Sequence, residues 1–332
     1  MPRIPRTTLD TAIYLYPSKE DAEHGEKVGG SGFLVGLPRR KGDEQGWIYA
    51  VTNRHVAEQC NVIRLNTLDG GKRVEGAKAW ILHPDRKTDL AIASLGVTNL
   101  KIYSFQTFMP RFHFIDKTRL VNFEIGVGDD CYMIGRFVNQ EGFQKNLPTA
   151  RFGAIAQMPG EPIWTKWVTH DEAYLVEVRS IAGFSGSPVV VRVPSQRARG
   201  VPLGKRVVDD PANDWHMLLG IDCGHSNDNA ESLYETGSEE PVKGYEIEYN
   251  TGLAIVIPAW KLQELIDCDE AEKMREEESQ EYKQRARGVR LDVRAPKQRT
   301  SPKEGEPVEA PVPTREGFMR DLTKATRKRE KK

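Results

Sequence analysis

The sequence has no net charge, no long hydrophobic run and no closely spaced cysteines. Its 332 residues include 48 Lys and Arg and 48 Asp and Glu, so the formal charge is zero. A zero balance gives no reason to expect a nucleic-acid partner. No apolar run approaches the roughly 20 residues that a membrane helix needs, so we expect no membrane partner. The N-terminal residues also lack the apolar stretch of a secretory signal, so we expect no export by that route.

The chain has four cysteines, which are far apart and form no CxxC pair: Cys60, Cys131, Cys223 and Cys268. This spacing does not support a zinc knuckle or a thioredoxin motif. Two disulfides would be possible in an exported protein of this size. Without a secretory signal we favour reduced thiols and a cytoplasmic location.

Short β-rich segments separated by turn residues fill the chain between about residues 11 and 256. The whole chain has 29 Gly and 20 Pro, and with the short β-branched runs between them they favour strands and turns over a helical bundle. About ten to twelve strands without alternating helices argue against a parallel α/β sheet and indicate one β-barrel or a pair. The segments are SGFLVGL, WIYAVTN, VIRLNT, KAWILH, DLAIASL, DCYMIGR, YLVEVR, SPVVVRV, HMLLGIDCG and GLAIVIP.

The C-terminal part is predicted to be a helix followed by a disordered tail. Residues 258–287 have an apolar face at Leu262, Leu265 and Ile266 and then become strongly charged, so 269–285 is predicted to be a charged helical extension. Residues 286–332 contain 14 Lys and Arg against 7 Asp and Glu and are rich in proline. Such a segment cannot bury enough apolar surface to offset its ordering entropy. We expect a solvated basic tail, or else a docking segment for a protein partner.

The sequence GFSGSP at 183–188 is the strongest local signal for chemistry. On its own it is also consistent with an ordinary small-residue turn before a strand. A nucleophilic serine needs a tight, exposed turn whose backbone N–H groups converge on the oxyanion of a tetrahedral intermediate. Gly183 allows the backbone conformation that turns its N–H inward, so Ser185 is a candidate nucleophile.

A serine hydroxyl needs a base, and His55 is the best placed of the seven histidines. It follows the apolar strand WIYAVTN, where Thr52 and Asn53 offer helix-capping chemistry. Asp89 opens another apolar strand, so we expect it to be partly buried and to need a partner such as an imidazole N–H. Asp85 lies in a turn and is expected at the surface.

The order His55, Asp89, Ser185, with spacings of 34 and 96 residues, is that of a chymotrypsin-type triad. Around these residues the chain resembles the bacterial trypsin-like serine peptidases, namely the HtrA/Deg proteases and the glutamyl endopeptidases. The resemblance covers about residues 25–268. The motifs that carry it are GSGFL at 30–34, TNRHV at 52–56, TDLAI at 88–92, GFSGSPV at 183–189, LGI at 219–221 and GLAIVIP at 252–258.

The resemblance implies an all-β fold of two antiparallel six-stranded barrels over residues 25–268, preceded by an extension at 1–24. It implies that His55 is the general base, Asp89 orients it and Ser185 is the nucleophile, with the backbone N–H groups of Gly183 and Ser185 as oxyanion hole. It implies no metal or organic cofactor and a protein or peptide substrate. No PDZ domain is expected, because only about 60 residues follow the barrels.

The substrate pocket is predicted at Asp222, Cys223 and Gly224. In glutamyl endopeptidases the residue matching Asp222 is a histidine that reads an acidic side chain, so we do not expect glutamate specificity. A shift in the alignment would make His225 the reader. The leading function is a serine endopeptidase. The alternative is a catalytically silent trypsin-like module that binds peptides or recruits partners through its C-terminal helix and tail.

Overall fold

The computed structural model describes residues 3–26, 29–38, 46–95, 102–140, 142–164, 169–170, 172–197, 214–232, 245–292, 297–300 and 308–311. The chain divides into two compact units, Met1–Glu272 and Lys273–Lys332. Within the described ranges, no helix combines the length and the apolar character that crossing a membrane requires. The four cysteines all lie in these ranges and form no disulfide. A cytoplasmic location stays a prediction.

The N-terminal half is a seven-stranded antiparallel sheet in the order β5-β4-β1-β2-β3-β7-β6. Its strands are β1 (Ala12–Tyr16), β2 (Gly30–Pro38), β3 (Gly46–Thr52), β4 (Val62–Asn66), β5 (Lys72–Gly76), β6 (Ile81–Leu82) and β7 (Ala91–Ser94). All five residues of β1 are buried, and β1 pairs with both β2 and β4. The fold therefore begins earlier than the predicted boundary at residue 25, because these apolar residues form the middle of the sheet.

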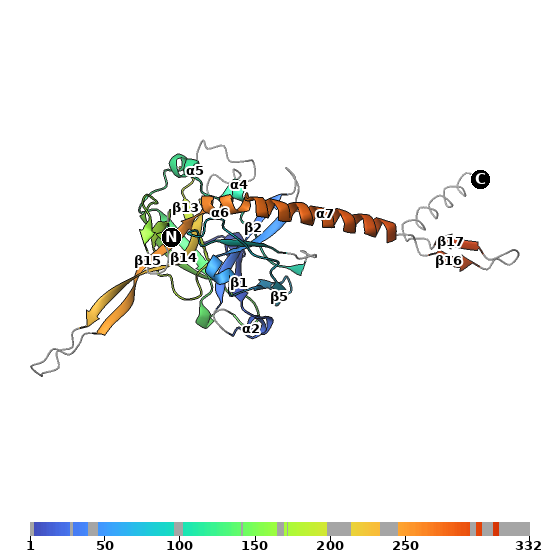
Figure 1. Cartoon of the computed structure of the whole chain (residues 1–332), viewed down its shortest axis with the longest axis horizontal. Helices are drawn as coiled ribbons and strands as arrows, with labels where there is room; N and C mark the ends of the chain where they lie inside the picture. The colour runs from blue at the N-terminus through green and yellow to red at the C-terminus, as the bar shows by residue number, and fades with distance from the viewer. Residues whose placement is uncertain are drawn as a thin grey trace, which may run out of the picture. The chain divides into compact units, whose positions relative to one another are not determined.

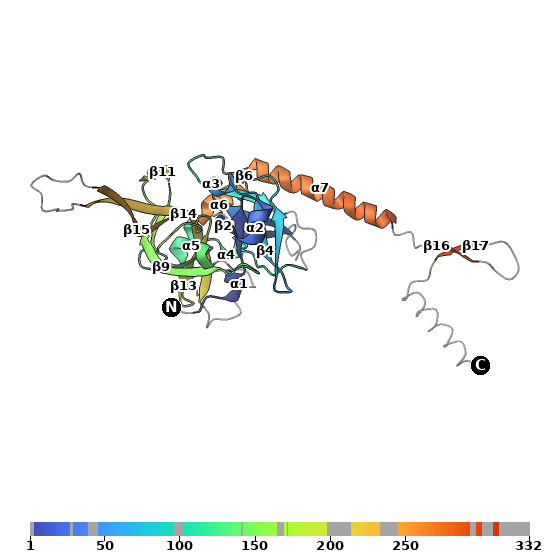
Figure 2. The same cartoon turned by 90° about the horizontal axis from the view of Figure 1, so that it is seen from below.

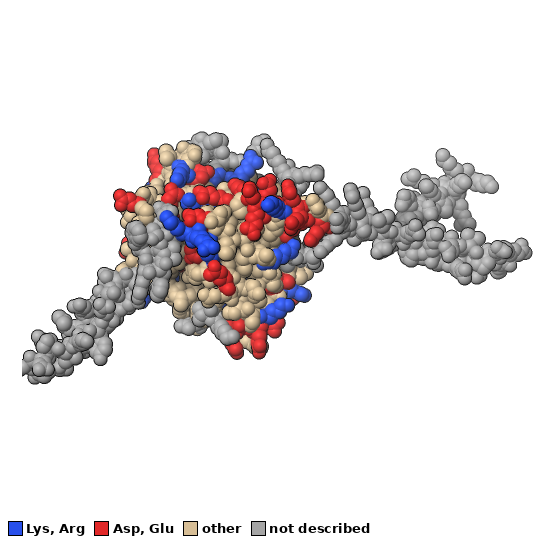
Figure 3. Space-filling view, in the orientation of Figure 1, with Lys and Arg blue, Asp and Glu red and all other residues tan. Residues whose placement is uncertain are grey.

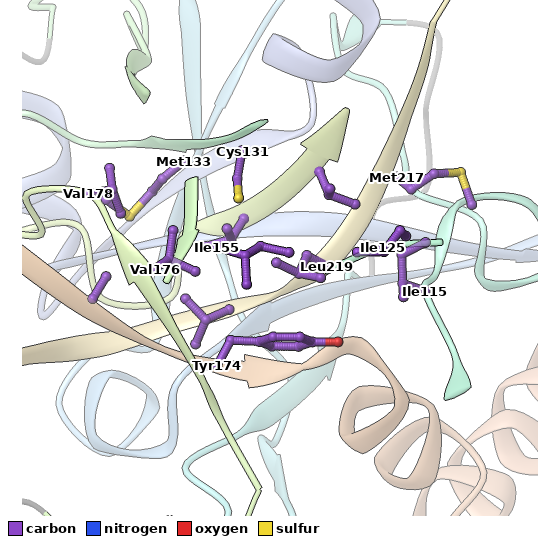
Figure 4. Packing of buried hydrophobic residues seen from close by; sticks show 14 of the residues in the cluster. Ile115, Ile125, Cys131, Met133, Ile155, Tyr174, Val176, Val178, Met217 and Leu219 are labelled. Atoms are coloured by element: carbon purple, nitrogen blue, oxygen red, sulfur yellow. The ribbon is translucent and has the colours of Figure 1, made fainter. Parts of the chain in front are cut away.

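The C-terminal half is a closed six-stranded barrel in the order β12-β15-β14-β13-β8-β9. Its strands are β8 (Asp130–Gly135), β9 (Thr149–Gln157), β12 (Tyr174–Glu177), β13 (Pro188–Val193), β14 (Trp215–Ser232) and β15 (Tyr245–Pro258). A short separate ribbon is formed by β10 (Ile163–Trp164) and β11 (Thr169–His170). Figure 4 shows Tyr174, Ile155 and Leu219 meeting from different strands inside the barrel. Burial of such side chains is the main source of stability for a barrel of this size.

The predicted all-β fold with a six-stranded barrel is confirmed, and the two halves differ in closure. The first sheet ends in β6, which has only two residues, and in the half-exposed strand β5. Among the described residues no ladder joins these two edges, so this sheet is an open half-barrel where a second closed barrel was predicted. Figures 1 and 2 show the sheet and the barrel side by side.

Short helices connect the strands without forming a layer of their own. They are α1 (Arg6–Leu9), α2 (Lys19–His24), α3 (Arg54–Ala57), α4 (Pro110–His113), α5 (Lys117–Asn122) and a 3₁₀ turn at Val138–Gln140. The strands β14 and β15 continue beyond the barrel as a two-stranded ribbon (Figure 1). Their register shifts between Asp222 and Gly224 and again between His225 and Asn227.

Two helices follow the barrel, α6 (Ala259–Ile266) and α7 (Asp269–Asp292). The predicted apolar face is buried at Leu262, Leu265 and Ile266, but the predicted single helix is interrupted at residues 267–268. Within the predicted tail, α7 continues to Asp292. Two further strands, β16 (Lys297–Thr300) and β17 (Val308–Pro311), pair with each other. The rest of 286–332 lies outside the described residues, and its predicted disorder stays a prediction.

The basic side chains are scattered on the face drawn in Figure 3. There, Lys and Arg form no extended basic region among the described residues, whereas Asp and Glu gather in the upper part of the view. A surface that binds nucleic acid concentrates its positive charge on one face. The expectation that nucleic acid is not a partner stays a prediction, and this face is consistent with it.

Candidate active site

His55 and Asp89 are joined by two hydrogen bonds. His55 lies in α3, directly after β3, and its backbone N–H donates to Asp89 Oδ1 at 3.0 Å. The ring Nδ1 lies 2.6 Å from Asp89 Oδ2. An ionised carboxylate only accepts, so Nδ1 carries the proton in this pair. Nε2 of a neutral His55 is then unprotonated and can accept a proton from another group.

The residues before His55 support this pair in a way that differs from the prediction. Asn53 is the N-cap residue of α3, but its side chain makes no capping bond. Its Nδ2 instead donates to the backbone oxygen of Asp89 at 3.0 Å. The Thr52 hydroxyl donates to the backbone oxygen of Ser31 at 2.8 Å. The two side chains therefore bond to the backbone of neighbouring segments of the N-terminal sheet region instead of capping α3.

The pKa of His55 is raised above its ordinary value of 6.5 by these surroundings. Burial by itself lowers this pKa, but the hydrogen bond to Asp89 and the charges of Asp89 and Asp222 raise it by more. The side chain of Asp89 is 15% exposed, which confirms the expected partial burial, and that of His55 is 46% exposed. The imidazole thus has one edge on a carboxylate, and the side chain is about half exposed. Asp85 is exposed, as predicted.

The turn that carries Ser185 is built on two glycines with positive φ. Gly183 has φ 93° and Gly186 has φ 87°. A Cβ on Gly186 would lie 2.1 Å from the backbone oxygen of Ser31, and one on Gly183 would lie 2.8 Å from the Val138 side chain. Only glycine meets both the conformational and the spatial requirement at these positions. The prediction that position 183 needs a backbone conformation available to glycine is consistent with this geometry.

Alternate N–H groups of the turn are used in backbone hydrogen bonds. Phe184 N–H donates to the oxygen of Ile181, and Gly186 N–H donates to that of Asp222 at 2.8 Å. Within the described part of the chain, the N–H groups of Gly183 and Ser185 donate to no backbone or side-chain acceptor. Gly183 is nevertheless buried, and a buried N–H without a partner is costly. These two donors are the ones expected to form an oxyanion hole.

The turn lies against the N-terminal sheet beside α3. Ser31 N–H donates to the backbone oxygen of Ser185 at 2.9 Å. A Cβ on Gly30 would touch both this oxygen, at 3.2 Å, and the side chain of Val56, at 2.5 Å. Ser185 is therefore brought close to the residue that follows His55. No hydrogen bond between the Ser185 hydroxyl and the imidazole is present, and catalytic hydrogen bonds are often long in a structure without substrate.

The two serines of the turn differ in exposure. Ser185 is partly exposed, whereas Ser187 is fully buried and its hydroxyl has no hydrogen-bond partner in the described part of the chain. A Cβ on Gly135 would lie 2.1 Å from Ser187 Oγ, so strand β8 blocks that side. Only the first serine has the access that a nucleophile needs.

Asp222 is fully buried, whereas side chains that line an open pocket are partly exposed. Its Oδ2 accepts from the Ser180 hydroxyl at 2.8 Å, and its Oδ1 accepts from Gly224 N–H at 3.4 Å. Burial raises the pKa of Asp222 to about 7 against the effect of these two donors and of His55. Cys223 and Gly224 are partly exposed. The substrate pocket at these residues stays a prediction, and the fully buried Asp222 offers no exposed surface to it.

No set of three or more His, Cys, Asp or Glu side chains in the described ranges could hold a metal ion. Sequence reasoning missed the hydroxyl of Ser31, which is fully buried and bonded to the turn. The signal was present in GSGFL at 30–34, where a serine is placed between two glycines before an apolar strand. Nothing local indicates that this hydroxyl has a partner 152 residues away.

Residues 30–193 match the family described as "Trypsin-like peptidase domain", and this range includes His55, Asp89 and Ser185. No curated protein sequence matches the chain. Among solved structures, the MamO protease domain from Magnetospirillum magneticum is 15% identical, with 77% of this chain and 95% of that chain covered and a TM-score of 0.43. The serine endoprotease from Yersinia pestis is 18% identical, with 79% and 64% covered and a TM-score of 0.41. The match over residues 30–193 carries the assignment: this chain contains a trypsin-like peptidase domain.

Proposed function

We propose that this protein is a serine endopeptidase that hydrolyses peptide bonds through His55, Asp89 and Ser185. The observation that carries the proposal is the arrangement of the two sides of the site. His55 and Asp89, joined by two hydrogen bonds, lie beside the glycine turn. This turn presents one accessible serine and two N–H groups that donate to no acceptor in the described part of the chain. Acyl transfer needs a base, a nucleophile and an oxyanion site in this combination.

In the first step the Ser185 oxygen attacks the carbonyl carbon of the scissile bond. His55 Nε2 takes the hydroxyl proton, and Asp89 stabilises the imidazolium that forms while it holds Nδ1–H. The hydrogen bond at 2.6 Å between Nδ1 and Asp89 supports this role. The raised pKa of His55 has the same origin, since a carboxylate beside the ring favours the charged form.

In the tetrahedral intermediate the former carbonyl oxygen becomes an oxyanion. The N–H groups of Gly183 and Ser185 donate to it, which stabilises the charge more than the neutral carbonyl of the substrate. His55 then gives its proton to the leaving amine and an acyl-enzyme remains. Water activated by His55 attacks the ester carbon, and Ser185 recovers its proton as the acid leaves.

The test compares Ser185→Ala with Ser187→Ala, two changes of one hydroxyl within the same turn. Hydrolysis of a denatured protein and of a peptide mixture is followed by mass spectrometry, and the serine is labelled with a fluorophosphonate probe. We expect Ser185→Ala to lose the label and at least about 10⁴-fold in kcat, because the triad residues act as a unit. Both variants keep their fold, since each alanine fits its site.

Ser187→Ala is expected to keep the label and the activity, because its hydroxyl is buried and unpaired in the described part of the chain. Hydrolysis by Ser185→Ala at near the wild-type rate would contradict a serine mechanism. A wild-type protein that neither hydrolyses peptides nor takes the label would favour the silent binding module.

A further inference from the structure

Ser31 joins the N-terminal sheet to the nucleophile turn through its backbone and its hydroxyl. It lies in β2 and is fully buried. Its N–H donates to the backbone oxygen of Ser185 at 2.9 Å, and its hydroxyl donates to the backbone oxygen of Gly183 at 2.7 Å. One residue of the first half therefore bonds to both residues whose N–H groups form the proposed oxyanion hole.

We infer that Ser31 is a positioning residue that holds the oxyanion turn in its reactive conformation, an inference that rests on the proposed function. The hydroxyl fixes the direction of the Gly183 carbonyl and so the plane of the peptide between Gly183 and Phe184. Gly183 has φ 93°, a conformation that glycine can leave easily. The N–H of this peptide is held within the turn by the backbone oxygen of Ile181, and its carbonyl is held by the Ser31 hydroxyl.

The hydroxyl of Ser31 is itself fixed from the other side. It accepts a hydrogen bond from the backbone N–H of Arg136 at 2.7 Å, at the end of β8 in the barrel. The hydroxyl donates its proton to Gly183 and accepts from Arg136. A serine side chain can make both bonds in one rotamer. The barrel thus orients the Ser31 hydroxyl, and the hydroxyl orients the turn of the same barrel.

The backbone of Ser31 connects the turn to the base. Its oxygen accepts from the Thr52 hydroxyl, and Asn53, the next residue, donates to the backbone of Asp89. Hydrogen bonds on the two adjacent residues Thr52 and Asn53 therefore link the carboxylate side of the site to Ser31 and so to the nucleophile side. This set passes between the two halves of the fold, where small relative movements would separate the base from the serine.

The test is Ser31→Ala, with Thr11→Val as matched control. Both changes remove a buried, hydrogen-bonded hydroxyl from the N-terminal half, since Thr11, directly before β1, donates through Oγ1 to the backbone oxygen of Thr8 at 2.7 Å. Thr11 makes no bond to the turn. For Ser31→Ala we expect kcat per titrated active site to fall about 10- to 100-fold with KM within twofold, since a misplaced oxyanion donor acts on the transition state alone.

Ser31→Thr keeps the hydroxyl and is expected to restore kcat to within about threefold. Thr11→Val is expected to lower stability without changing kcat per titrated site. If Ser31→Ala is recovered only unfolded, Ser31→Cys carries the same expectation, because a thiol fills the site and is a weak donor and a weak acceptor, which weakens both bonds. A normal kcat per site in the alanine or cysteine variant, with only fewer active molecules, would mean that Ser31 is merely structural and would overturn the inference.

Crystal structures of the wild type and of Ser31→Ala give a readout that needs no activity. We expect the peptide between Gly183 and Phe184 to change its orientation in the variant. An unchanged turn would overturn the inference. Should the wild type show neither hydrolysis nor fluorophosphonate labelling, the proposed function fails, and the orientation of this peptide still decides the role of Ser31.

Discussion

The carboxylate of Asp89 accepts hydrogen bonds from two different groups of His55, the backbone N–H at 3.0 Å and the ring Nδ1 at 2.6 Å. The backbone bond fixes where α3 begins relative to the strand that follows Asp89. The ring bond fixes the rotation and the tautomer of the imidazole. A carboxylate can serve both donors at once because each of its oxygens has two acceptor positions.

The first prediction is that Asp89→Asn lowers kcat on the order of 10⁴-fold. Asparagine can still accept the backbone N–H through its oxygen, but its NH₂ group then faces Nδ1. This forces the proton onto Nε2, so His55 can no longer act as base. The measurement is kcat for a peptide substrate together with a thermal unfolding curve.

The control for this change is Asp85→Asn. Asp85 is exposed and its Oδ1 accepts from the backbone N–H of Lys87 at 3.0 Å. We expect its kcat to stay within about twofold of wild type, because its carboxylate bonds to Lys87 and not to the imidazole. A loss of less than tenfold in Asp89→Asn would show that Asp89 does not set the tautomer.

The second prediction concerns the pH dependence of kcat/KM. The base must be neutral, so kcat/KM rises with pH as His55 loses its proton. Since the pKa of His55 is raised, the midpoint should lie above 6.5. In Asp222→Asn the midpoint should move a little to lower pH, because Asp222, with a pKa of about 7, is partly ionised where His55 titrates and its charge then raises the pKa of His55. A flat profile between pH 5 and 8 would argue against His55 as base.

The third prediction is that Asp222 makes the wild type less stable as the pH rises. The pKa of this fully buried carboxyl is raised to about 7 from 3.8, so the folded state holds its proton more tightly than the unfolded state. Its contribution to stability is fully present below pH 3.8 and is lost as the pH rises through 7. A shift of this size corresponds to about 4 kcal/mol at most.

Asp222→Asn removes this titration, and its amide can replace the protonated carboxyl in bonds to Ser180 and Gly224. Urea unfolding at pH 4.5 and pH 8 measures the effect. The free energy of unfolding of the variant minus that of the wild type should be more positive at pH 8 than at pH 4.5. If that difference is the same at both pH values, the carboxyl does not titrate in this range.

The fourth prediction is that Arg64→Lys lowers the free energy of unfolding by about 3 kcal/mol. Arg64 is fully buried in β4, its guanidinium lies 5.0 Å from the centre of the Tyr16 ring, and its Nε donates to Asn146 Oδ1 at 2.7 Å. It also donates to the backbone oxygen of Gly142 at 3.1 Å. A lysine ammonium is a point charge and cannot reproduce this fork.

Arg73→Lys, on the exposed side of β5, is the control for charge-preserving substitution of a neighbouring arginine. It should change the free energy of unfolding by less than about 0.5 kcal/mol. Urea unfolding with the transition slope checked for each variant is the measurement. Equal effects of the two substitutions would mean that the buried hydrogen bonds of Arg64 contribute nothing specific.

The sequence by itself determined the strand segments and the candidate triad. WIYAVTN and SPVVVRV became β3 and β13, because their β-branched and aromatic residues favour an extended backbone that is buried on one or both faces. His55 and Asp89 were recognisable because each follows or precedes such a strand within one or two residues. The glycines around Ser185 indicated positive φ for a reason that is equally local.

Only the tertiary structure decided the closure of the sheets and the partners of buried polar groups. β1 pairs on both sides in the middle of the first sheet, which nothing within AIYLY specifies. The Ser31 hydroxyl meets Gly183 across 152 residues, and Arg64 meets Asn146 across 82. Local side-chain patterns select strand, turn or helix, but a buried hydroxyl or guanidinium bonds to whichever group the folded chain brings within about 3 Å.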